Sequence, residues 1–374
     1  MTTLSRRGAM MLPLGLAGLA AACAPAARQM AMNADPSGRA DPEMLALLES
    51  YARLNPAPIE TLGAADARRQ PSMADAVRAR ALEQQNTNPQ RPINSYNDIT
   101  LTTLPNGLPA RIYRPISASA GPLPVILYFH GGGWVIADID TYDSSARALC
   151  AEAEAIVVSV HYRQGPEFRF PTAHDDANLA YAWVVTNAAA INGDPNRIAI
   201  VGESAGGNLA LNTAIFARDR RMGSPRAVVA IYPVGGVDLE TASYQQFANA
   251  KPLGRPAIQW FVSNYTTGPR DLQDPRLDLA GRADLRGLPP VFIVNAEIDP
   301  LQTDGARLEE KIRASGGQVT RTVYPGVTHE FFGADAVLTK AKQAQRQVGE
   351  QLRAAFAAAP PAAPARPVRR RAGI

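Results

Sequence analysis

The sequence contains few cysteines and few histidines, and it has no apolar run of the length that usually spans a bilayer. Its two cysteines lie far apart among 374 residues, which excludes a disulfide scaffold. The net charge is only +4, and no basic stretch is interleaved with aromatic residues, so nucleic-acid binding is not indicated. A chain of this length can form one large α/β domain with a full core, or two smaller domains.

The first 23 residues are expected to form an export signal that is not part of the fold. Paired arginines at positions 6 and 7 precede the apolar run 9–22, which is too short for a comfortable membrane span. The arginine pair is similar to a twin-arginine signal, and Ala22-Cys23 resembles a lipoprotein processing site. Two outcomes stay open, lipidation of Cys23 or simple cleavage nearby. Both predict an exported protein, either periplasmic or anchored in a membrane.

Composition divides the rest of the chain into a tether, one folded domain and a tail. Residues 24–40 are rich in alanine, proline and methionine without periodicity, which predicts a flexible tether. We expect an α/β domain over residues 41–357, with a cap formed by about 41–90 and 240–268. The basic, proline-rich residues 358–374 are predicted to be disordered.

Apolar runs without polar alternation, separated by helical stretches, predict a mostly parallel sheet with helices on both faces. These runs occupy residues 125–129, 156–160, 198–201, 228–231 and 291–296, and residues 318–324 are expected to form the last strand. Residues 97–114 alternate around Pro105-Asn106-Gly107, which predicts two strands joined by a tight turn. Residues 240–268 interrupt the βα rhythm, and we interpret them as an insertion over the site.

The run that ends at Val201 leads into Gly202-Glu203-Ser204-Ala205-Gly206, a G-x-S-x-G sequence followed by a helical stretch. In such a strand-to-helix turn the serine adopts a strained bend that exposes its hydroxyl group. The glycines are needed because the strand and helix backbones cross closely. The N–H of Ala205 has no partner within the helix and can face developing negative charge. An isolated G-x-S-x-G sequence is equally consistent with an ordinary small-residue turn, so the assignment depends on the rest of the chain.

A serine hydroxyl needs a nearby base to act as a nucleophile at neutral pH. The chain offers four histidines, His130, His161, His174 and His329. Only His329 lies in a short loop after the last predicted strand, at the sheet edge where Ser204 also lies. Asp299 follows the run 291–296, and the order Ser204, Asp299, His329 is the one expected for an α/β-hydrolase. Asp304 is expected inside the next helix, whereas Glu297 stays open as a supporting hydrogen-bond partner.

Three consecutive glycines follow the run 125–129, in His130-Gly131-Gly132-Gly133. Without side chains, their N–H groups can approach a substrate oxygen, and removing one such donor typically costs about 10²–10³ in rate. A glycine-rich loop alone is weak evidence. It is not typical of a phosphate-binding loop, because no Gly-Lys-Ser or Gly-Lys-Thr sequence follows it.

Together, these motifs resemble those of the hormone-sensitive-lipase-like esterases. The matching segments are His130-Gly131-Gly132-Gly133-Trp134, His161-Tyr162-Arg163, Gly202-Glu203-Ser204-Ala205-Gly206-Gly207, Asp299-Pro300-Leu301 and the loop that ends at His329. The resemblance covers about residues 41–356 and implies an α/β-hydrolase fold of about eight mostly parallel strands with a helical cap. It also implies that the amides of Gly132, Gly133 and Ala205 form an oxyanion hole, with His130, Gly131 and Glu203 as supporting motif residues. Two departures are His161, where the family usually has aspartate, and Gln164-Gly165, where it usually has leucine and alanine.

These features predict a serine carboxylesterase that hydrolyses short-chain esters of small molecules through an acyl-enzyme, without a metal or organic cofactor. The short-chain preference is implied by the resemblance and not by individual residues. Three alternatives stay open: an exported deacetylase of polysaccharide or xenobiotic acetyl esters, an amidase or long-chain lipase, and a catalytically silent binding module on this fold. The sequence indicates no oligomeric state.

Overall fold

The computed structural model describes residues 33–102, 107–116 and 121–358. The predicted export signal with Cys23, the residues beyond 358 and Pro105-Asn106 therefore lie outside the described residues. The predicted tether is too long at its carboxyl end, because Ala34 and Asp35 are buried. The Asp35 carboxylate accepts hydrogen bonds from the amides of Ser37 and Ala40, which fixes the local turn, and Ala34 packs into the hydrophobic core of the domain. Within the described ranges, no helix is both long enough and apolar enough to cross a bilayer.

The described residues form one eight-stranded sheet in the order β1-β2-β4-β3-β5-β6-β7-β8. Its strands are β1 (Ser95–Leu101), β2 (Leu108–Arg114), β3 (Leu123–Phe129), β4 (Ile156–Val160), β5 (Gly193–Glu203), β6 (Val228–Ile231), β7 (Val291–Ile298) and β8 (Val319–Thr328). β2 pairs antiparallel with both β1 and β4, and every other pair is parallel. The prediction of a mostly parallel α/β sheet is confirmed.

Both faces of the sheet are buried, which explains why its central strands lack polar alternation. Successive side chains of a strand point to opposite faces. On β3, Val125, Leu127 and Phe129 accordingly join one hydrophobic core, whereas Ile126 and Tyr128 join the other.

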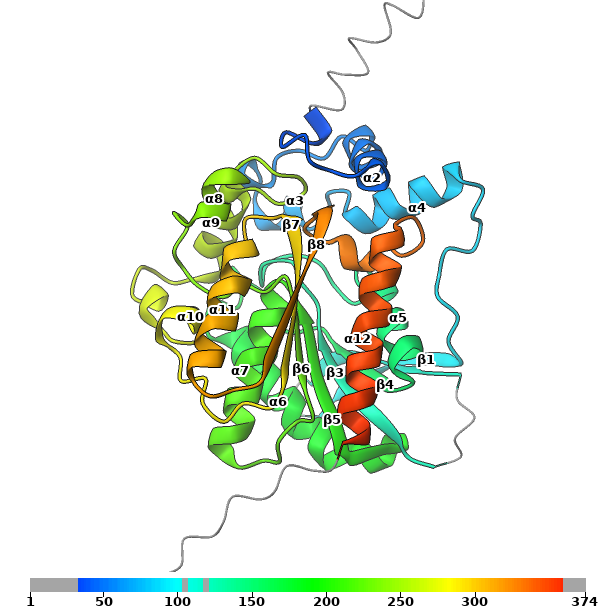
Figure 1. Cartoon of the computed structure of the whole chain (residues 1–374), viewed down its shortest axis with the longest axis vertical. Helices are drawn as coiled ribbons and strands as arrows, with labels where there is room; N and C mark the ends of the chain where they lie inside the picture. The colour runs from blue at the N-terminus through cyan, green and yellow to red at the C-terminus, as the bar shows by residue number, and fades with distance from the viewer. Residues whose placement is uncertain (1–32, 103–106, 117–120, 359–374) are drawn as a thin grey trace, which may run out of the picture.

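The helices form a layer on each face of the sheet (Figure 1). One layer holds α6 (Thr172–Asn187), α7 (Ala205–Arg220), α10 (Leu279–Arg282) and α11 (Gln302–Ala314), and the other holds α5 (Asp143–Ala153) and α12 (Thr339–Ala357). Short 3₁₀ helices are η1 (Ile59–Thr61), η2 (Ala188–Ile191), η3 (Asp271–Gln273) and η4 (Phe331–Gly333). Cys150 on α5 is fully buried, and this burial raises the pKa of its thiol to about 12, so it packs as a small apolar side chain.

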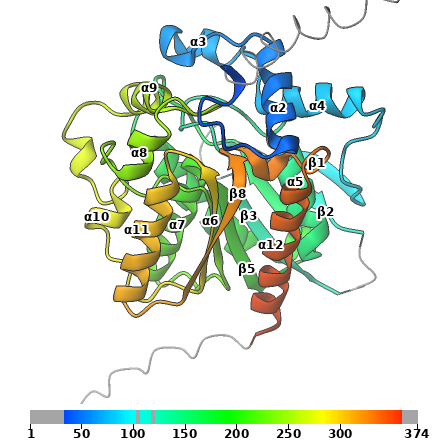
Figure 2. The same cartoon turned by 45° about the horizontal axis from the view of Figure 1, so that its top comes forward.

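Two segments far apart in the sequence gather over the end of the sheet at which β7 and β8 terminate (Figures 1 and 2). The first contributes α2 (Pro42–Arg53), α3 (Ala64–Ala67) and α4 (Met73–Glu83), and the second contributes α8 (Ala242–Gln246) and α9 (Arg255–Tyr265). The indole N–H of Trp260 on α9 donates to the carbonyl oxygen of Leu62 at 2.9 Å, which joins the two segments. These segments are the cap helices of the domain.

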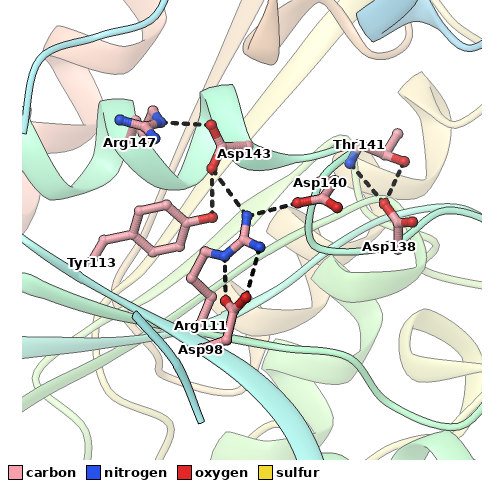
Figure 3. A network of polar contacts seen from close by, with 8 residues as sticks. All are labelled: Asp98, Arg111, Tyr113, Asp138, Asp140, Thr141, Asp143 and Arg147. Atoms are coloured by element: carbon pink, nitrogen blue, oxygen red, sulfur yellow. Dashed lines mark hydrogen bonds and ion pairs between the residues drawn. The ribbon is translucent and has the colours of Figure 1, made fainter. Parts of the chain in front are cut away.

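A charged network ties the loop between β3 and α5 to the hairpin of β1 and β2 (Figure 3). Arg111 on β2 pairs with Asp98 of β1 at 2.5 Å and with Asp140 of the loop at 2.7 Å. It also lies 3.6 Å from Asp143 at the start of α5, which accepts a hydrogen bond from the Tyr113 hydroxyl at 2.9 Å. The loop that passes beside the candidate site is therefore held by several long-range contacts.

Candidate functional site

Ser204 lies at the turn between β5 and α7, with a backbone φ of +56° and ψ of −118°. This conformation is unfavourable for a residue with a Cβ atom and persists only where the surrounding structure imposes it. A Cβ atom at Gly202 would lie 2.0 Å from the Gly206 carbonyl oxygen, and one at Gly206 would lie 2.1 Å from that of Phe129. Only glycine fits at these two positions, which explains the spacing of the motif.

Asp299 directly follows β7, and His329 directly follows β8, so the two parallel strands deliver them to the same edge of the sheet. Nδ1 of His329 lies 2.7 Å from Oδ2 of Asp299, and both side chains are buried. The other carboxylate oxygen, Oδ1, accepts the N–H of Leu301 at 2.9 Å. Because the carboxylate can only accept, Nδ1 carries the proton and Nε2 is left as the basic nitrogen.

The pKa of His329 is shifted in the opposite direction to the pKa values of the other three histidines. Burial lowers the pKa of His130 to about 3, lowers that of His174 to about 4, and also lowers that of His161. Burial acts in the same direction on His329, but the charge and hydrogen bond of Asp299, together with the charges of Glu330 and Glu203, outweigh it, so the pKa of His329 is raised. His329 is therefore the histidine whose surroundings stabilise a bound proton.

The glycine loop follows β3 and has backbone conformations that exclude other residues. Gly132 and Gly133 have φ values of +94° and +59°. A Cβ atom at Gly132 would lie 2.2 Å from the Ile136 carbonyl oxygen, and one at Gly133 would lie 2.2 Å from the ring of Phe261. The loop is held from below by the Tyr162 hydroxyl, which donates to the carbonyl oxygens of His130 and Gly131 at 2.9 and 3.1 Å.

A cavity of about 620 Å³ brings most of the predicted site residues together. Gly132, Gly133, Ser204 and His329 all line it. Ala205 begins α7 directly after Ser204, where a helix has backbone N–H groups without intrahelical partners. Apolar side chains from the cap and the neighbouring loops line the rest, among them Val237, Leu239, Leu253, Ile258, Phe261 and Leu301. The arrangement suits an uncharged substrate held against a serine hydroxyl.

Other predicted residues support the backbone. Glu203 is buried and accepts hydrogen bonds from the hydroxyl groups of Tyr128 and Tyr232, and its burial raises its pKa. Glu297 accepts the N–H of Gly326 at 2.7 Å, and Asp304 lies inside α11, where its carboxylate accepts the N–H groups of Gly235 and Gly236. Glu297, which the sequence left open as a supporting hydrogen-bond partner, thus joins β7 to β8.

The two departures from the family pattern both touch the glycine loop or its continuation. The ring of His161 stacks on that of His130, with centroids 5.6 Å apart, and both Nδ1 of His161 and Nε2 of His130 are buried without a hydrogen-bond partner. The Gln164 amide donates to the carbonyl oxygens of Ile136 and Ala137, each at 2.8 Å. Gln164 thereby holds the segment that follows the loop.

Glu330 is a site residue that the sequence reasoning missed. It directly follows His329, lines the same cavity as Ser204 and has a left-handed φ of +66°. Its burial raises the pKa of its carboxyl group. Neither a motif nor a periodic pattern marks this position. Its adjacency to His329 was the only signal in the sequence.

Known proteins with a similar sequence and structure are α/β hydrolases. A family model described as the alpha/beta hydrolase fold matches residues 126–333. An α/β hydrolase from the metagenome of Lake Arreo is 31% identical and superposes with a TM-score of 0.76, covering 85% of this chain and 99% of that chain. A hyperthermophilic esterase from the archaeon Pyrobaculum calidifontis, also 31% identical, superposes with a TM-score of 0.71, covering 79% and 94%.

Curated relatives narrow the class further. Carboxylesterase NlhH of Mycobacterium tuberculosis is 42% identical over 243 residues, which is 63% of this chain and 75% of that protein. Ethyl acetate hydrolase of Pseudomonas putida is 35% identical over 301 residues, which is 79% of this chain and 91% of that protein. The chain belongs to the hormone-sensitive-lipase-like esterase family of the α/β-hydrolase superfamily, and it is a carboxylic ester hydrolase.

The raised pKa of His329 predicts the acidic limb of the activity profile. A general base must be neutral to accept a proton, so activity should be low below the pKa of His329 and should rise as pH passes it. With a non-ionising ester, kcat/KM should therefore rise with a midpoint above the ordinary histidine value of about 6.5. In Asp299→Asn, the residual activity should show this midpoint at lower pH, because the charge that raises the pKa is gone. A parent midpoint well below 6.5 would contradict the assignment of His329 as the base.

Proposed function

We propose that this ester hydrolase cleaves short-chain carboxylic esters through a covalent acyl-enzyme, with Ser204 as nucleophile, His329 as base and Asp299 as the residue that orients the base. The observation that carries the proposal is the buried 2.7 Å contact between Asp299 and His329 beside a cavity that Ser204 also lines. A base that is oriented by a third group and shares a cavity with a strained serine is an arrangement that serves nucleophilic catalysis.

In the proposed reaction, the Ser204 hydroxyl oxygen attacks the ester carbonyl carbon while Nε2 of His329 takes its proton. The negative oxygen of the tetrahedral intermediate accepts hydrogen bonds from the amides of Gly132, Gly133 and Ala205. The bond to the alcohol then breaks, and His329 donates its proton to the departing oxygen. Water repeats these steps on the acyl-enzyme and releases the acid.

Removing the nucleophile tests this assignment directly. Ser204→Ala should lower the turnover of aryl acetates by about 10⁴-fold or more, because binding and amide contacts remain but no acyl-enzyme forms. His329→Ala should have an effect of similar size. Ser315→Ala, at the far end of α11, is the matched control and should retain parent activity. Near-parent turnover in a folded Ser204→Ala protein would overturn the proposed function.

The short-chain preference is supported by the cavity of about 620 Å³ and by the relative named ethyl acetate hydrolase. Across a series of aryl esters, kcat/KM should be highest for acetyl to butyryl groups and lower by about tenfold or more for decanoyl and longer groups. Fastest cleavage of the long-chain esters would favour the lipase alternative. Preferential release of acetate from an acetylated glycan would favour the exported deacetylase.

We also propose that the protein is exported and anchored through a lipid on Cys23. The support is the paired arginines, the short apolar run and the Ala22-Cys23 junction of the sequence. In a bacterial host, Cys23→Ser should move esterase activity from the membrane fraction to the soluble or unprocessed fraction. Cys150→Ser is the control, because Cys150 lies inside the fold. A Cys23→Ser protein that stays in the membrane with normal processing would contradict the anchor.

A further inference from the structure

A second cavity of about 390 Å³ adjoins the substrate cavity. The wall that the two share consists of Met73 and Arg78 from α4, Asp140 and Thr141 from the loop before α5, and Glu330. The loop part of this wall is the segment that Arg111 holds through Asp140 (Figure 3). Glu203, which directly precedes Ser204, also lines the second cavity. The two spaces are therefore separated by a fixed and largely polar wall.

Glu330 is the member of this wall that directly follows the proposed base in the chain. Its left-handed backbone, with φ at +66°, is uncommon for a residue with a long side chain. Glu330 lines both cavities, and no lysine or arginine of the described residues forms an ion pair with it. The one hydrogen bond to its side chain is a long one of 3.4 Å from the Tyr142 hydroxyl.

A carboxyl group in this position needs further hydrogen-bond partners. Glu330 is partly exposed, and a carboxyl oxygen without a close protein donor is normally solvated by water. Both cavities next to Glu330 are larger than a water molecule requires, and the second has polar lining groups such as Thr141, Ser144 and Asn88. Water held by Glu330 would lie beside His329, where the second half of the reaction consumes it.

We propose that Glu330 is a positioning residue that holds the water which hydrolyses the acyl-enzyme, and that the second cavity supplies this water. This inference rests on the proposed acyl-enzyme mechanism. The water oxygen attacks the carbonyl carbon of acyl-Ser204, and one water proton passes to Nε2 of His329. The bond from the carbonyl carbon to the Ser204 oxygen then breaks, and that oxygen takes the proton from His329. Glu330 accepts a hydrogen bond from the other water proton and is unchanged at the end.

If the hydrolytic water comes through the second cavity, the products formed from the acyl-enzyme should depend on Glu330, and this can be measured. The acyl group and the departing alcohol occupy the substrate cavity, so water that arrives through that cavity competes with them for space. Water that arrives through the second cavity, past Glu330, does not compete with the acyl group or the alcohol for space. An added alcohol such as methanol has only one O–H proton, which passes to His329, so it has none left to donate to Glu330. The competition between water and methanol for one acyl-enzyme therefore reports on Glu330.

The test replaces Glu330 with glutamine, which keeps its shape but replaces one acceptor oxygen with a donor. At a fixed methanol concentration, the ratio of methyl ester to free acid should rise about tenfold, the effect of losing one charge-assisted hydrogen bond. The acylation rate, measured from the first turnover of a p-nitrophenyl ester, should change much less than the product ratio, because acylation does not use the water that Glu330 is proposed to hold. An initial burst of p-nitrophenol should become visible as deacylation slows.

Two further variants keep the test decisive. Glu330→Gly relieves the left-handed backbone and removes the carboxyl group, so it should give the same change in product ratio if the glutamine variant folds poorly. Glu154→Gln is the matched control. Glu154 is also a left-handed glutamate, with φ at +51°, but it lies exposed at the end of α5, and its replacement should change neither rate.

The supply route is tested by Ala336→Met, because Ala336 lines the second cavity and does not line the first. Narrowing the second cavity should raise the ratio of methyl ester to free acid while acylation stays near the parent rate. An unchanged ratio in both Glu330 variants would overturn the role of Glu330, and an unchanged ratio in Ala336→Met would overturn the supply route. Failure of the acyl-enzyme mechanism itself would show instead as an active Ser204→Ala protein, so the two failures are distinguishable.

Discussion

The close crossing of three backbone segments at Ser204 is the constraint on which the rest of the site depends. β5, the start of α7 and the end of β3 approach so closely that a single Cβ atom at Gly202 or Gly206 would collide with backbone carbonyl groups. The same crossing sets the distance between the serine turn and the glycine loop, because that loop begins where β3 ends. The positive φ of Ser204 is a local cost of this arrangement, and the N–H of Ser204 recovers a hydrogen bond to the Ile231 carbonyl oxygen at 2.8 Å.

Around this crossing, the protein concentrates buried carboxyl and phenol groups and places one imidazole among them. The ring of Tyr232 packs 4.5 Å from that of His329, centroid to centroid, and its hydroxyl group donates to Glu203. Asp299 contacts the imidazole directly, whereas Glu203 and Glu330 act on it by charge at longer range. Burial would otherwise make the imidazole a weak base. The acidic surroundings restore its affinity for a proton, which is the property that proton transfer from a serine requires.

Local patterns were sufficient to predict the sheet and the residues at its edge. Apolar runs such as 125–129 indicate burial on both faces. Ser204 and Asp299 each follow such a run at a short distance, and His329 follows the last predicted strand, 318–324. The second cavity was not predictable in this way, because it depends on how α4 packs beside the loop at Asp140. That loop is in turn held by ion pairs of Arg111 that join residues distant in the sequence. Likewise, Ala34 and Asp35 show no periodic pattern, yet Ala34 packs into the hydrophobic core and Asp35 is buried, so the tether ends earlier than composition predicted.

The sheet carries the groups proposed to react with the substrate, whereas the cap provides most of the apolar wall that would select the substrate. The groups proposed to make and break bonds stand on strand ends whose positions are fixed by the hydrogen bonds of the sheet. The apolar wall of the cavity comes largely from α9 and neighbouring loops, which meet the amino-terminal helices through contacts such as Trp260 with Leu62. Arg68 extends this connection by donating to the carbonyl oxygen of Val135, just beyond the glycine loop. Changes in the cap can therefore alter the size of the cavity while leaving the serine turn intact, except where Phe261 touches Gly133. At that contact, substrate size and the position of the amide donors are coupled, so a residue that enlarges the cavity there also releases the loop proposed to bind the oxyanion.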